Sequence, residues 1–314
     1  MKKRKKARRT ERVLLVDGDL ICYRLVTCQD FLKETQNDRD EWWEVLQAGQ
    51  AMDELEARTT EAMKLAGCNS ALFAFGSVDN FRKIQVDATY KANRAGKRKP
   101  LGFYSFCEKT EELWPRLCVP TLEADDVLGI YHTDNSVCPT ETVIWSEDKD
   151  MRTLPGYLLA GGEEPQLNFV TEPEALCNWL VQILTGDSSD GYPGCPGIGK
   201  VKAARTIDVE VVAELLKRLS WEETAAKLFK NFIVPLFEEK GLSEEDAIRQ
   251  GRLARILRAG DCDVTAEEVE VRLWNPYDFL EGHFSKARSS KRSKKTRKAS
   301  QTTQKKTNRG RTST

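Results

Sequence analysis

Short apolar runs that end at turns or at acidic residues mark the first half of the chain. Each run is rich in Val, Leu, Ile or Phe, which is typical of a buried strand. Five such runs predict strands, at residues 13–16, 71–75, 142–145, 157–159 and 167–170. Helix-forming segments lie between them, and from about residue 40 to 66 the residues Trp42, Leu46 and Leu55 recur at helical spacing. The alternation predicts an α/β fold with a mostly parallel central sheet flanked by helices.

Beyond about residue 171 the apolar spacing becomes helical. We expect helices over residues 174–185, 201–206, 209–219, 221–236 and 243–257, and then an edge strand at 271–274. From residue 285 onward Ser, Thr, Lys and Arg dominate, which predicts disorder. The expected parts are a basic N-terminal tail (1–11), an α/β core (12–170), a helical part (171–284) and a disordered basic tail (285–314).

The formal net charge of zero hides a division along the chain. Residues 2–9 hold seven Lys or Arg, and residues 285–314 hold twelve with no acidic residue, which leaves 30 basic against 49 acidic residues between 10 and 284. Basic arms of this kind commonly bind polyanions. A solubilising or targeting role is the alternative for these tails.

Composition also excludes several classes of protein. No apolar stretch approaches the ~18 residues of a membrane span, so we expect no membrane association. The basic N-terminus has no apolar segment behind it, so a secretory signal is not expected. Nine cysteines without any Cys-x-x-Cys pair predict a reducing compartment, without a disulfide framework or a zinc site.

Acidic residues gather where strands end and where helices begin. They are Asp17 and Asp19; Glu123, Asp125 and Asp126; Asp148 and Asp150; and Asp187 and Asp190. In open parallel sheets the carboxyl ends of the strands form the ligand-binding edge, so we expect these groups to converge. Each group also has an ordinary explanation: Asp19 or Asp187 can belong to a turn, and Glu123 can cap a helix.

Convergent carboxylates require counter-ions. Two like charges ~4 Å apart repel by about 4 kcal/mol at an effective dielectric constant of ~20. Carboxylates without His or Cys partners favour Mg²⁺ or Mn²⁺. Two such ions ~3.5–4 Å apart are a common apparatus for cleaving phosphodiesters.

Two further segments favour nucleic acid. Gly194 to Ala204 is a glycine-rich turn entering a helix, and Gly197, Gly199, Lys200 and Lys202 could hold a phosphate backbone without reading its sequence. Val201 after Lys200 departs from the nucleotide P-loop spacing, and a plain helix–helix corner is the alternative.

The second segment is a dense cationic stretch with interspersed aromatic rings. It contains Arg82, Tyr90, Lys91, Arg94 and Lys97. Cations for phosphates and rings for base stacking suit single-stranded ends of nucleic acids. A solvated basic helix is the alternative explanation.

The combination of these motifs resembles the flap endonuclease/5′→3′ exonuclease superfamily, especially the stand-alone 5′→3′ exonucleases of short-tailed lytic phages. The 5′-nuclease domain of bacterial DNA polymerase I belongs to the same superfamily. The matching motifs are Val16-Asp17-Gly18-Asp19, Asn80-Phe81-Arg82-Lys83, Tyr90-Lys91-Ala92-Asn93-Arg94, Glu123-Ala124-Asp125-Asp126, Ser146-Glu147-Asp148-Lys149-Asp150, Gly186-Asp187-Ser188-Ser189-Asp190-Gly191 and Gly197-Ile198-Gly199. With similar stretches at 251–257 and 273–276, the likeness runs from about residue 12 to 276.

The resemblance implies a PIN-like nuclease core, a helical arch around residues 80–110 and a helix-three-turn-helix that grips duplex DNA, often with K⁺. Asp17, Glu123 and Asp125 would hold one Mg²⁺ or Mn²⁺ ion. Asp148, Asp150 and Asp187 would hold the second, supported by Asp126 and Asp190. Lys91 and Arg94 would steer the scissile phosphate from the arch, and Tyr90 would stack on a base.

One position departs from the family pattern. The family usually has an Asp at the end of the second strand, where this chain has Ser77, with Asp79 two residues later. A two-residue shift keeps a side chain on the same face of an extended segment. Asp79 is therefore a candidate metal ligand, and an under-liganded first metal is the alternative.

The resemblance implies a metal-dependent 5′→3′ exonuclease, with flap endonuclease and RNase H-like activity, acting on DNA 5′ ends, flaps and RNA–DNA hybrids. The expected setting is phage replication or host DNA breakdown in the infected bacterial cytoplasm, by a monomer. Two alternatives remain at this point: a ribonuclease with a related four-acid sheet, and a catalytically impaired DNA-binding protein of the same fold.

Overall fold

The computed structural model describes residues 11–162, 164–264 and 269–280. The central sheet of this part of the chain has the strand order β5-β4-β1-β6-β7-β8. The strands are β1 Arg12–Asp17, β4 Ser70–Phe75, β5 Arg116–Cys118, β6 Glu141–Trp145, β7 Gly156–Ala160 and β8 Gln166–Val170. Neighbouring strands are parallel except β7 and β8. The predicted mostly parallel α/β core is confirmed.

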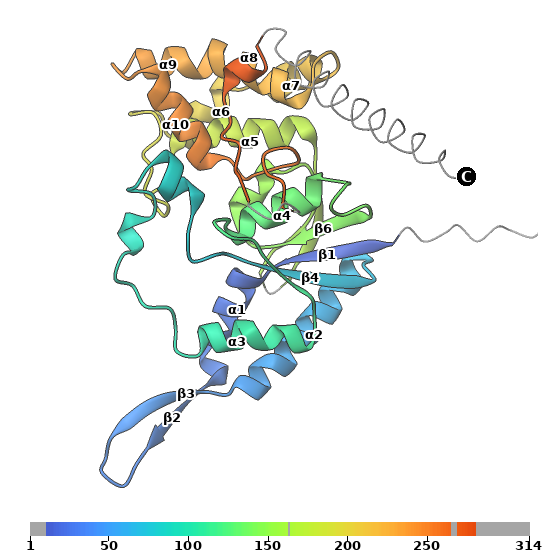
Figure 1. Cartoon of the computed structure of the whole chain (residues 1–314), viewed down its shortest axis with the longest axis vertical. Coiled ribbons are helices and arrows are strands. Elements are labelled where there is room, and N and C mark those ends of the chain that lie inside the picture. Colours follow the sequence, from blue (N-terminus) through green and yellow to red (C-terminus); the bar gives the residue numbers. More distant parts are fainter. Residues whose placement is uncertain (1–10, 163, 265–268, 281–314) are drawn as a thin grey trace, which may run out of the picture.

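Helices cover both faces of this sheet (Figure 1). They are α1 Gly18–Val26, α2 Ala48–Ala66 and α3 Phe103–Lys109 on one face, and α4 Ala124–Thr133 on the other. Successive side chains of a strand point to opposite faces. Leu14 and Val16 therefore join the apolar core under the first three helices, whereas Leu15 joins the core under α4.

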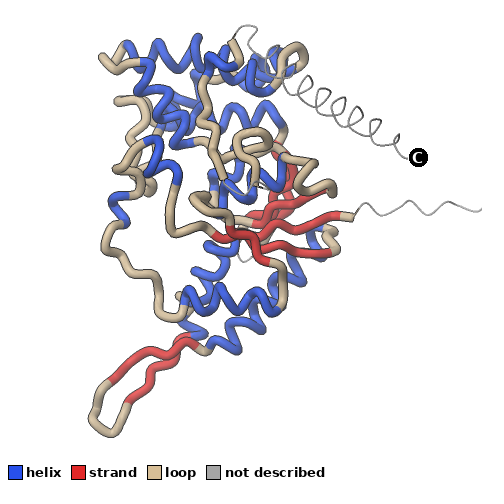
Figure 2. The backbone as a smooth tube through the Cα atoms, in the orientation of Figure 1, coloured by secondary structure: helices blue, strands red, loops and turns tan. Residues whose placement is uncertain are grey.

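The second half of the chain forms a helical part beside the sheet (Figure 2). Its helices are α5 Glu172–Thr185, α6 Lys200–Thr206, α7 Val209–Leu216, α8 Trp221–Leu228, α9 Val234–Glu238 and α10 Glu244–Ala254. Capping boxes at Thr171, Ser220 and Ser243 define where α5, α8 and α10 begin. The helix predicted over 221–236 is divided by a π-helical turn at Phe229–Ile233.

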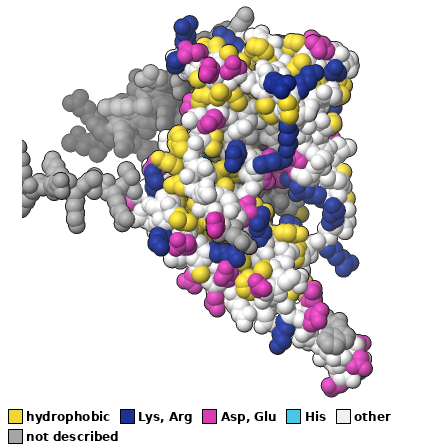
Figure 3. Space-filling model, turned by 180° about the vertical axis from the view of Figure 1, so that it is seen from behind, with side chains coloured by type: hydrophobic (Ala, Val, Ile, Leu, Met, Phe, Trp, Pro, Cys, Tyr) yellow, Lys and Arg dark blue, Asp and Glu magenta, His cyan; other side chains and the backbone are white. Residues whose placement is uncertain are grey.

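The helix predicted from about residue 40 was wrong at its start. Strands β2 Leu32–Gln36 and β3 Trp42–Leu46 form a separate antiparallel hairpin, and α2 begins only at Ala48. The Asn37 side chain accepts hydrogen bonds from the backbone of Arg39 and Glu41, which stabilises the turn between the strands. The hairpin projects from the body, with acidic side chains at its end (Figure 3).

Residues 80–110, where the helical arch is expected, contain several short helical segments and not one continuous helix. The segment has a π-helical turn at Arg82–Val86, a short 3₁₀ turn at Ala92–Arg94 and then α3. Gly96 and Gly102 have positive φ, and Pro100 lies between them, which explains why the helix is interrupted. The segment runs from the helical part to α3 along one side of the molecule (Figure 1).

The predicted strand at 271–274 is not formed. Val271 makes only an isolated bridge with Cys262, and the backbone of Arg272 donates to Asp261. The basic tails of the predicted organisation, apart from Glu11, lie outside the described residues. No helix in the described ranges is both long enough and apolar enough to span a membrane.

Candidate active site

An open pocket of about 490 Å³ lies at the carboxyl edge of the sheet. Among the described residues, eight acidic side chains line it: Asp17, Asp19, Glu123, Asp125, Asp148, Asp150, Asp187 and Asp190. They come from the β1–α1 junction, the start of α4, the segment after β6 and the segment after α5. Since the ends of β1 and β6 lie side by side, acidic groups far apart in the sequence meet in one place.

Asp17 is the most enclosed of the β1 carboxylates. It caps α1 by accepting from the Leu20 backbone at 3.1 Å, and it accepts a 2.7 Å hydrogen bond from the buried hydroxyl of Ser146. Burial, together with the nearby charges of Asp19 and Asp148, raises the pKa of Asp17 to about 6.

The next carboxylates show the same effect of crowding. Burial and the charges of Asp17 and Asp148 raise the pKa of Asp125 well above its usual range, and this side chain makes no hydrogen bond or ion pair with another described residue. Burial and the charge of Asp148 raise the pKa of Asp150 to about 6. These groups therefore favour an added positive charge.

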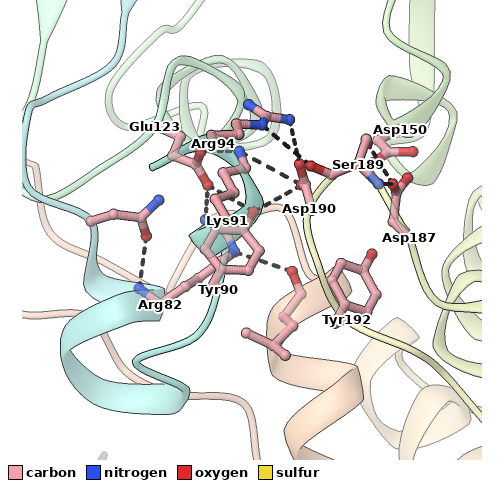
Figure 4. A network of polar contacts seen from close by, with 12 residues as sticks. Arg82, Tyr90, Lys91, Arg94, Glu123, Asp150, Asp187, Ser189, Asp190 and Tyr192 are labelled. Atoms are coloured by element: carbon pink, nitrogen blue, oxygen red, sulfur yellow. Dashed lines mark hydrogen bonds and ion pairs between the residues drawn. The ribbon is translucent and has the colours of Figure 1, made fainter. Parts of the chain in front are cut away.

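Basic side chains partly supply that charge on the opposite wall (Figure 4). Lys91 donates to Glu123, and Arg94 donates to Asp190 at 2.7 Å. Burial disfavours the charged form of Glu123, but Arg82 and Lys91 outweigh it and lower its pKa to about 2. Lys91 and Arg94, both predicted to be catalytic, thus lie in the pocket, and Lys97 also lines it.

Two predicted site residues have a structural role instead. The Arg82 side chain is 3% exposed, and it donates paired hydrogen bonds to Asp126 at 2.7 and 2.8 Å. It also donates to the backbone carbonyls of Leu253 and Arg255. Arg82 therefore cannot contact DNA in this structure, and the fully buried Asp126 has an arginine as its partner rather than an open coordination position.

Tyr90 is also placed differently from the prediction. It is 3% exposed, and its hydroxyl lies 2.9 Å from Asp190 and 3.1 Å from Glu123, to either of which it can donate (Figure 4). The ring packs in the core of the helical part. Base stacking would require an exposed ring face, which Tyr90 does not have here.

The Asp187 turn is held by local hydrogen bonds. Asp187 accepts from the backbone and the hydroxyl of Ser189, at 2.7 and 2.5 Å, and from Lys149 at 2.5 Å. Although burial favours the neutral form, these contacts lower the pKa of Asp187 to about 2. Gly186 precedes it with positive φ, and a Cβ there would lie 2.4 Å from the backbone of Pro193, so no other residue fits.

Asp79 is not brought to the pocket: it is exposed and is not among the lining residues. Asp19 lies there instead, and its Oδ2 accepts a 2.9 Å hydrogen bond from the Gly76 backbone at the end of β4. The metal-ligand prediction for this part of the site therefore missed Asp19. Its position two residues after Asp17, directly behind a strand, was the available signal.

The glycine turn lies apart from the pocket. Gly197 and Gly199 are exposed just before α6, and Lys200 and Lys202 are exposed in its first turn. Neither the glycines nor the lysines are pocket-lining residues. Their placement leaves them available to a ligand that extends beyond the pocket.

The donor chemistry fits a hard divalent cation. The lining acids provide only oxygen ligands, and crowding raises the pKa of several of them. Within the described ranges, no three His, Cys, Asp or Glu side chains are arranged as a ready metal cage. Ion pairs with Lys91 and Lys149 hold two of the candidate ligands, so metal binding would require these side chains to move.

Two phage nucleases are similar to this chain over most of its length. The exodeoxyribonuclease of Enterobacteria phage T3 is 29% identical over 290 residues, covering 84% of this chain and 93% of that protein. The exonuclease of Escherichia phage T7 is 28% identical over 294 residues, with the same two shares. No model of a known protein family matches the chain.

The fold is also similar to that of a solved phage protein. The T5 D15 protein co-crystallised with metal ions matches with a TM-score of 0.52 and 14% identity, over 78% of this chain and 89% of that one. At this identity the likeness concerns the fold alone. Together with the phage relatives, it confirms the resemblance inferred from the motifs. The chain therefore resembles the flap endonuclease/5′→3′ exonuclease superfamily in sequence and in fold, and it is a nuclease.

Proposed function

We propose that this protein is a divalent-metal-dependent 5′→3′ exonuclease that hydrolyses DNA phosphodiesters from 5′ ends and also cuts 5′ flaps. The observation that carries the proposal is the pocket itself, in which eight carboxylates face Lys91 and Arg94. A carboxylate wall repels DNA unless cations neutralise it, whereas the basic wall attracts phosphate. The names of the T3 and T7 relatives support the exonuclease part of this proposal.

The candidate ligands fall into two sets. Asp17, Glu123 and Asp125 would hold one Mg²⁺ or Mn²⁺ ion. The second set is Asp148, Asp150 and Asp187, with Asp190 beside it. Bound divalent cations supply charge for the phosphate and lower the pKa of water. The T5 proteins of similar fold were crystallised with metal ions and, in one case, with DNA, which supports a metal-dependent activity without bearing on the individual ligands.

The chain's own residues would orient the DNA strand. Lys91 and Arg94 lie on the rim beside Glu123 and Asp190, where their charges can hold the scissile phosphate. Lys97 extends the basic wall along the pocket. Hydrogen bonds from Ser146 to Asp17 and from Ser189 to Asp187 keep two candidate ligands in position.

The glycine turn before α6 would contact the duplex next to the cleaved end. Exposed Gly197 and Gly199 allow a close approach of the DNA backbone, and Lys200 and Lys202 add charge beside it. We assign this region as the helix-three-turn-helix, with K⁺ as its candidate ion. The wider proposal includes RNA–DNA hybrids as substrates and a monomer acting in phage replication or host DNA breakdown in the infected cytoplasm.

The test is digestion of a recessed-end duplex and a 5′-flap duplex, each labelled at the 5′ end, in Mg²⁺ and in EDTA. Asp148→Ala should abolish the release of label, and product sizes distinguish exonuclease from flap cleavage. Asp53→Asn is the matched control, because Asp53 is exposed on α2 away from the pocket. A single-stranded RNA substrate tests the ribonuclease alternative.

A second candidate rests on Ser77. This residue follows β4 and brings no carboxylate to the metal site. A protein that binds DNA without cleaving it in Mg²⁺ or Mn²⁺ would be a catalytically impaired DNA-binding member of the fold.

A further inference from the structure

Lys149 is a pocket-lining cation whose position differs from that of Lys91. Its Nζ lies 2.5 Å from Oδ2 of Asp187 and 3.8 Å from Oδ1 of Asp150. The Lys149 side chain is 61% exposed, whereas that of Asp187 is 5% exposed. The lysine therefore reaches from solvent to an enclosed carboxylate, and only its ammonium group is anchored there.

The two oxygens of Asp187 have different partners. Oδ1 accepts from the backbone and the hydroxyl of Ser189, so the turn itself holds this oxygen (Figure 4). Oδ2 has Lys149 as its partner among the described residues. Removal of the ammonium group would leave the carboxylate oriented and one oxygen open to another cation.

The cost of releasing Lys149 is small compared with that of releasing Lys91. The Lys91 side chain is 17% exposed and lies near both Glu123 and Asp190. The stem of Lys149 is mostly solvated, so its ammonium group returns to water on release, and an incoming cation takes its place beside the enclosed Asp187 carboxylate. After release, the four-carbon stem keeps the charge at the mouth of the same pocket.

We propose that Lys149 is an exchangeable counter-ion of Asp187. The Lys149 ammonium group and a divalent cation would bind Oδ2 of Asp187 alternately. When the cation displaces it, Lys149 contacts a backbone phosphate of the bound DNA. This inference rests on the proposed metal-dependent function, since it assigns Asp187 to the metal site. It makes Lys149 a positioning residue whose contact with DNA depends on metal.

The first test is calorimetric titration of the full chain with Mn²⁺. Lys149→Gln removes the competing charge, so we expect roughly fivefold tighter Mn²⁺ binding at one site, the scale of an ion pair whose lysine is largely solvated. Lys217→Gln is the matched control, because Lys217 forms an exposed ion pair with Glu214 away from the pocket. Unchanged or weaker Mn²⁺ binding in Lys149→Gln would overturn the proposal.

The second test measures the salt dependence of DNA binding, using a 5′-phosphorylated duplex with saturating Ca²⁺ or with EDTA. Loss of one phosphate contact lowers the slope of log K against log salt by about 0.9. Lys149→Gln should show this decrease in Ca²⁺ and no change in EDTA, and Lys149→Arg should restore the slope. An equal change in both buffers would indicate a permanent surface contact and contradict the exchange.

The two hypotheses fail in different ways. If the wild-type chain binds no Mn²⁺, the proposed metal-dependent function is wrong, and the role of Lys149 fails with it. If the wild type binds Mn²⁺ and Lys149→Gln behaves like Lys217→Gln, only the counter-ion role is wrong. Thermal unfolding of each variant checks that the fold is retained.

Discussion

Arg82 and Asp126 form a buried pair with two parallel hydrogen bonds, of 2.7 and 2.8 Å. The pair connects the π-helical turn at Arg82–Val86 to the first turn of α4. Asp126 also accepts from the backbone of Leu257, so segments far apart in the chain meet at this carboxylate. The pair therefore fixes the base of the segment that carries Lys91 and Arg94.

We predict that Arg82→Met lowers the free energy of unfolding by about 3–5 kcal/mol, because it leaves the Asp126 carboxylate buried without its cation. Urea unfolding measures the change. Arg58→Met is the control, since Arg58 pairs with Glu54 on the exposed face of α2 and should cost less than about 1 kcal/mol. An Arg82 variant of normal stability that has lost DNA affinity would instead support the original DNA-binding prediction.

Asp19 should matter for metal use, whereas Asp79 should not. Asp19→Asn keeps an acceptor for the Gly76 backbone but removes a charge from the pocket wall. We expect a roughly 10–100-fold loss of cleavage at limiting Mg²⁺, the range found for groups that tune metal sites. A Mg²⁺ titration of cleavage measures this effect. Asp79→Asn serves as the control and should cleave DNA as the wild type does. If Asp79→Asn lost cleavage at limiting Mg²⁺ and Asp19→Asn did not, Asp79 and not Asp19 would belong to the metal site.

His132 should make stability depend on pH. Its Nε2 donates to the Pro155 carbonyl at 2.9 Å, so Nδ1 accepts from the Thr142 hydroxyl at 2.6 Å. Burial lowers the pKa of His132 from 6.5 to about 4. Between these values the unfolded state binds the proton more readily, so this contribution to stability is present above pH 6.5 and is lost as the pH falls toward 4.

Proton linkage predicts that His132 lowers the free energy of unfolding by about 2 kcal/mol at about pH 5, relative to a pH above its unfolded pKa. Urea unfolding of the wild type and of His132→Gln at about pH 7.5 and about pH 5 measures this effect. The carboxylates that also titrate in this range are common to both proteins, so the difference between the two proteins isolates the contribution of His132. The difference in free energy of unfolding between the two proteins should shrink on acidification. A difference that stays constant with pH would contradict the buried neutral imidazole.

The C-terminal basic residues should contribute to non-specific DNA affinity. Residues 285–314 carry twelve Lys or Arg and no acid, whereas the rest of the chain from residue 10 is strongly acidic. Deletion of 285–314 should flatten the dependence of log K on log salt, because fewer counter-ions are released from the DNA. An unchanged slope in an anisotropy titration would refute that role.

Local sequence patterns determined much of the architecture. The apolar runs ending at Asp17 and before Asp148 became β1 and β6, because a short β-branched run bounded by polar residues has few ways to bury itself. The parallel arrangement then placed their acidic residues at one edge, so seven of the predicted metal ligands lie in the pocket. The failure at residues 40–46 arose because the hairpin turn depends on Asn37 and Asp40, outside the apolar pattern.

Other features depended on contacts between segments that are distant in the sequence. Arg82 and Tyr90 stand in a cationic, aromatic stretch whose composition is typical of an exposed nucleic-acid surface. Their burial follows from partners at Asp126, Asp190 and Leu253, up to 171 residues away. A charged side chain is buried only where a folded neighbour supplies its counter-ion. By itself the sequence therefore determined which charges this chain carries and which strands present its acids, whereas tertiary packing decided which of those charges face the pocket and which hold the fold together.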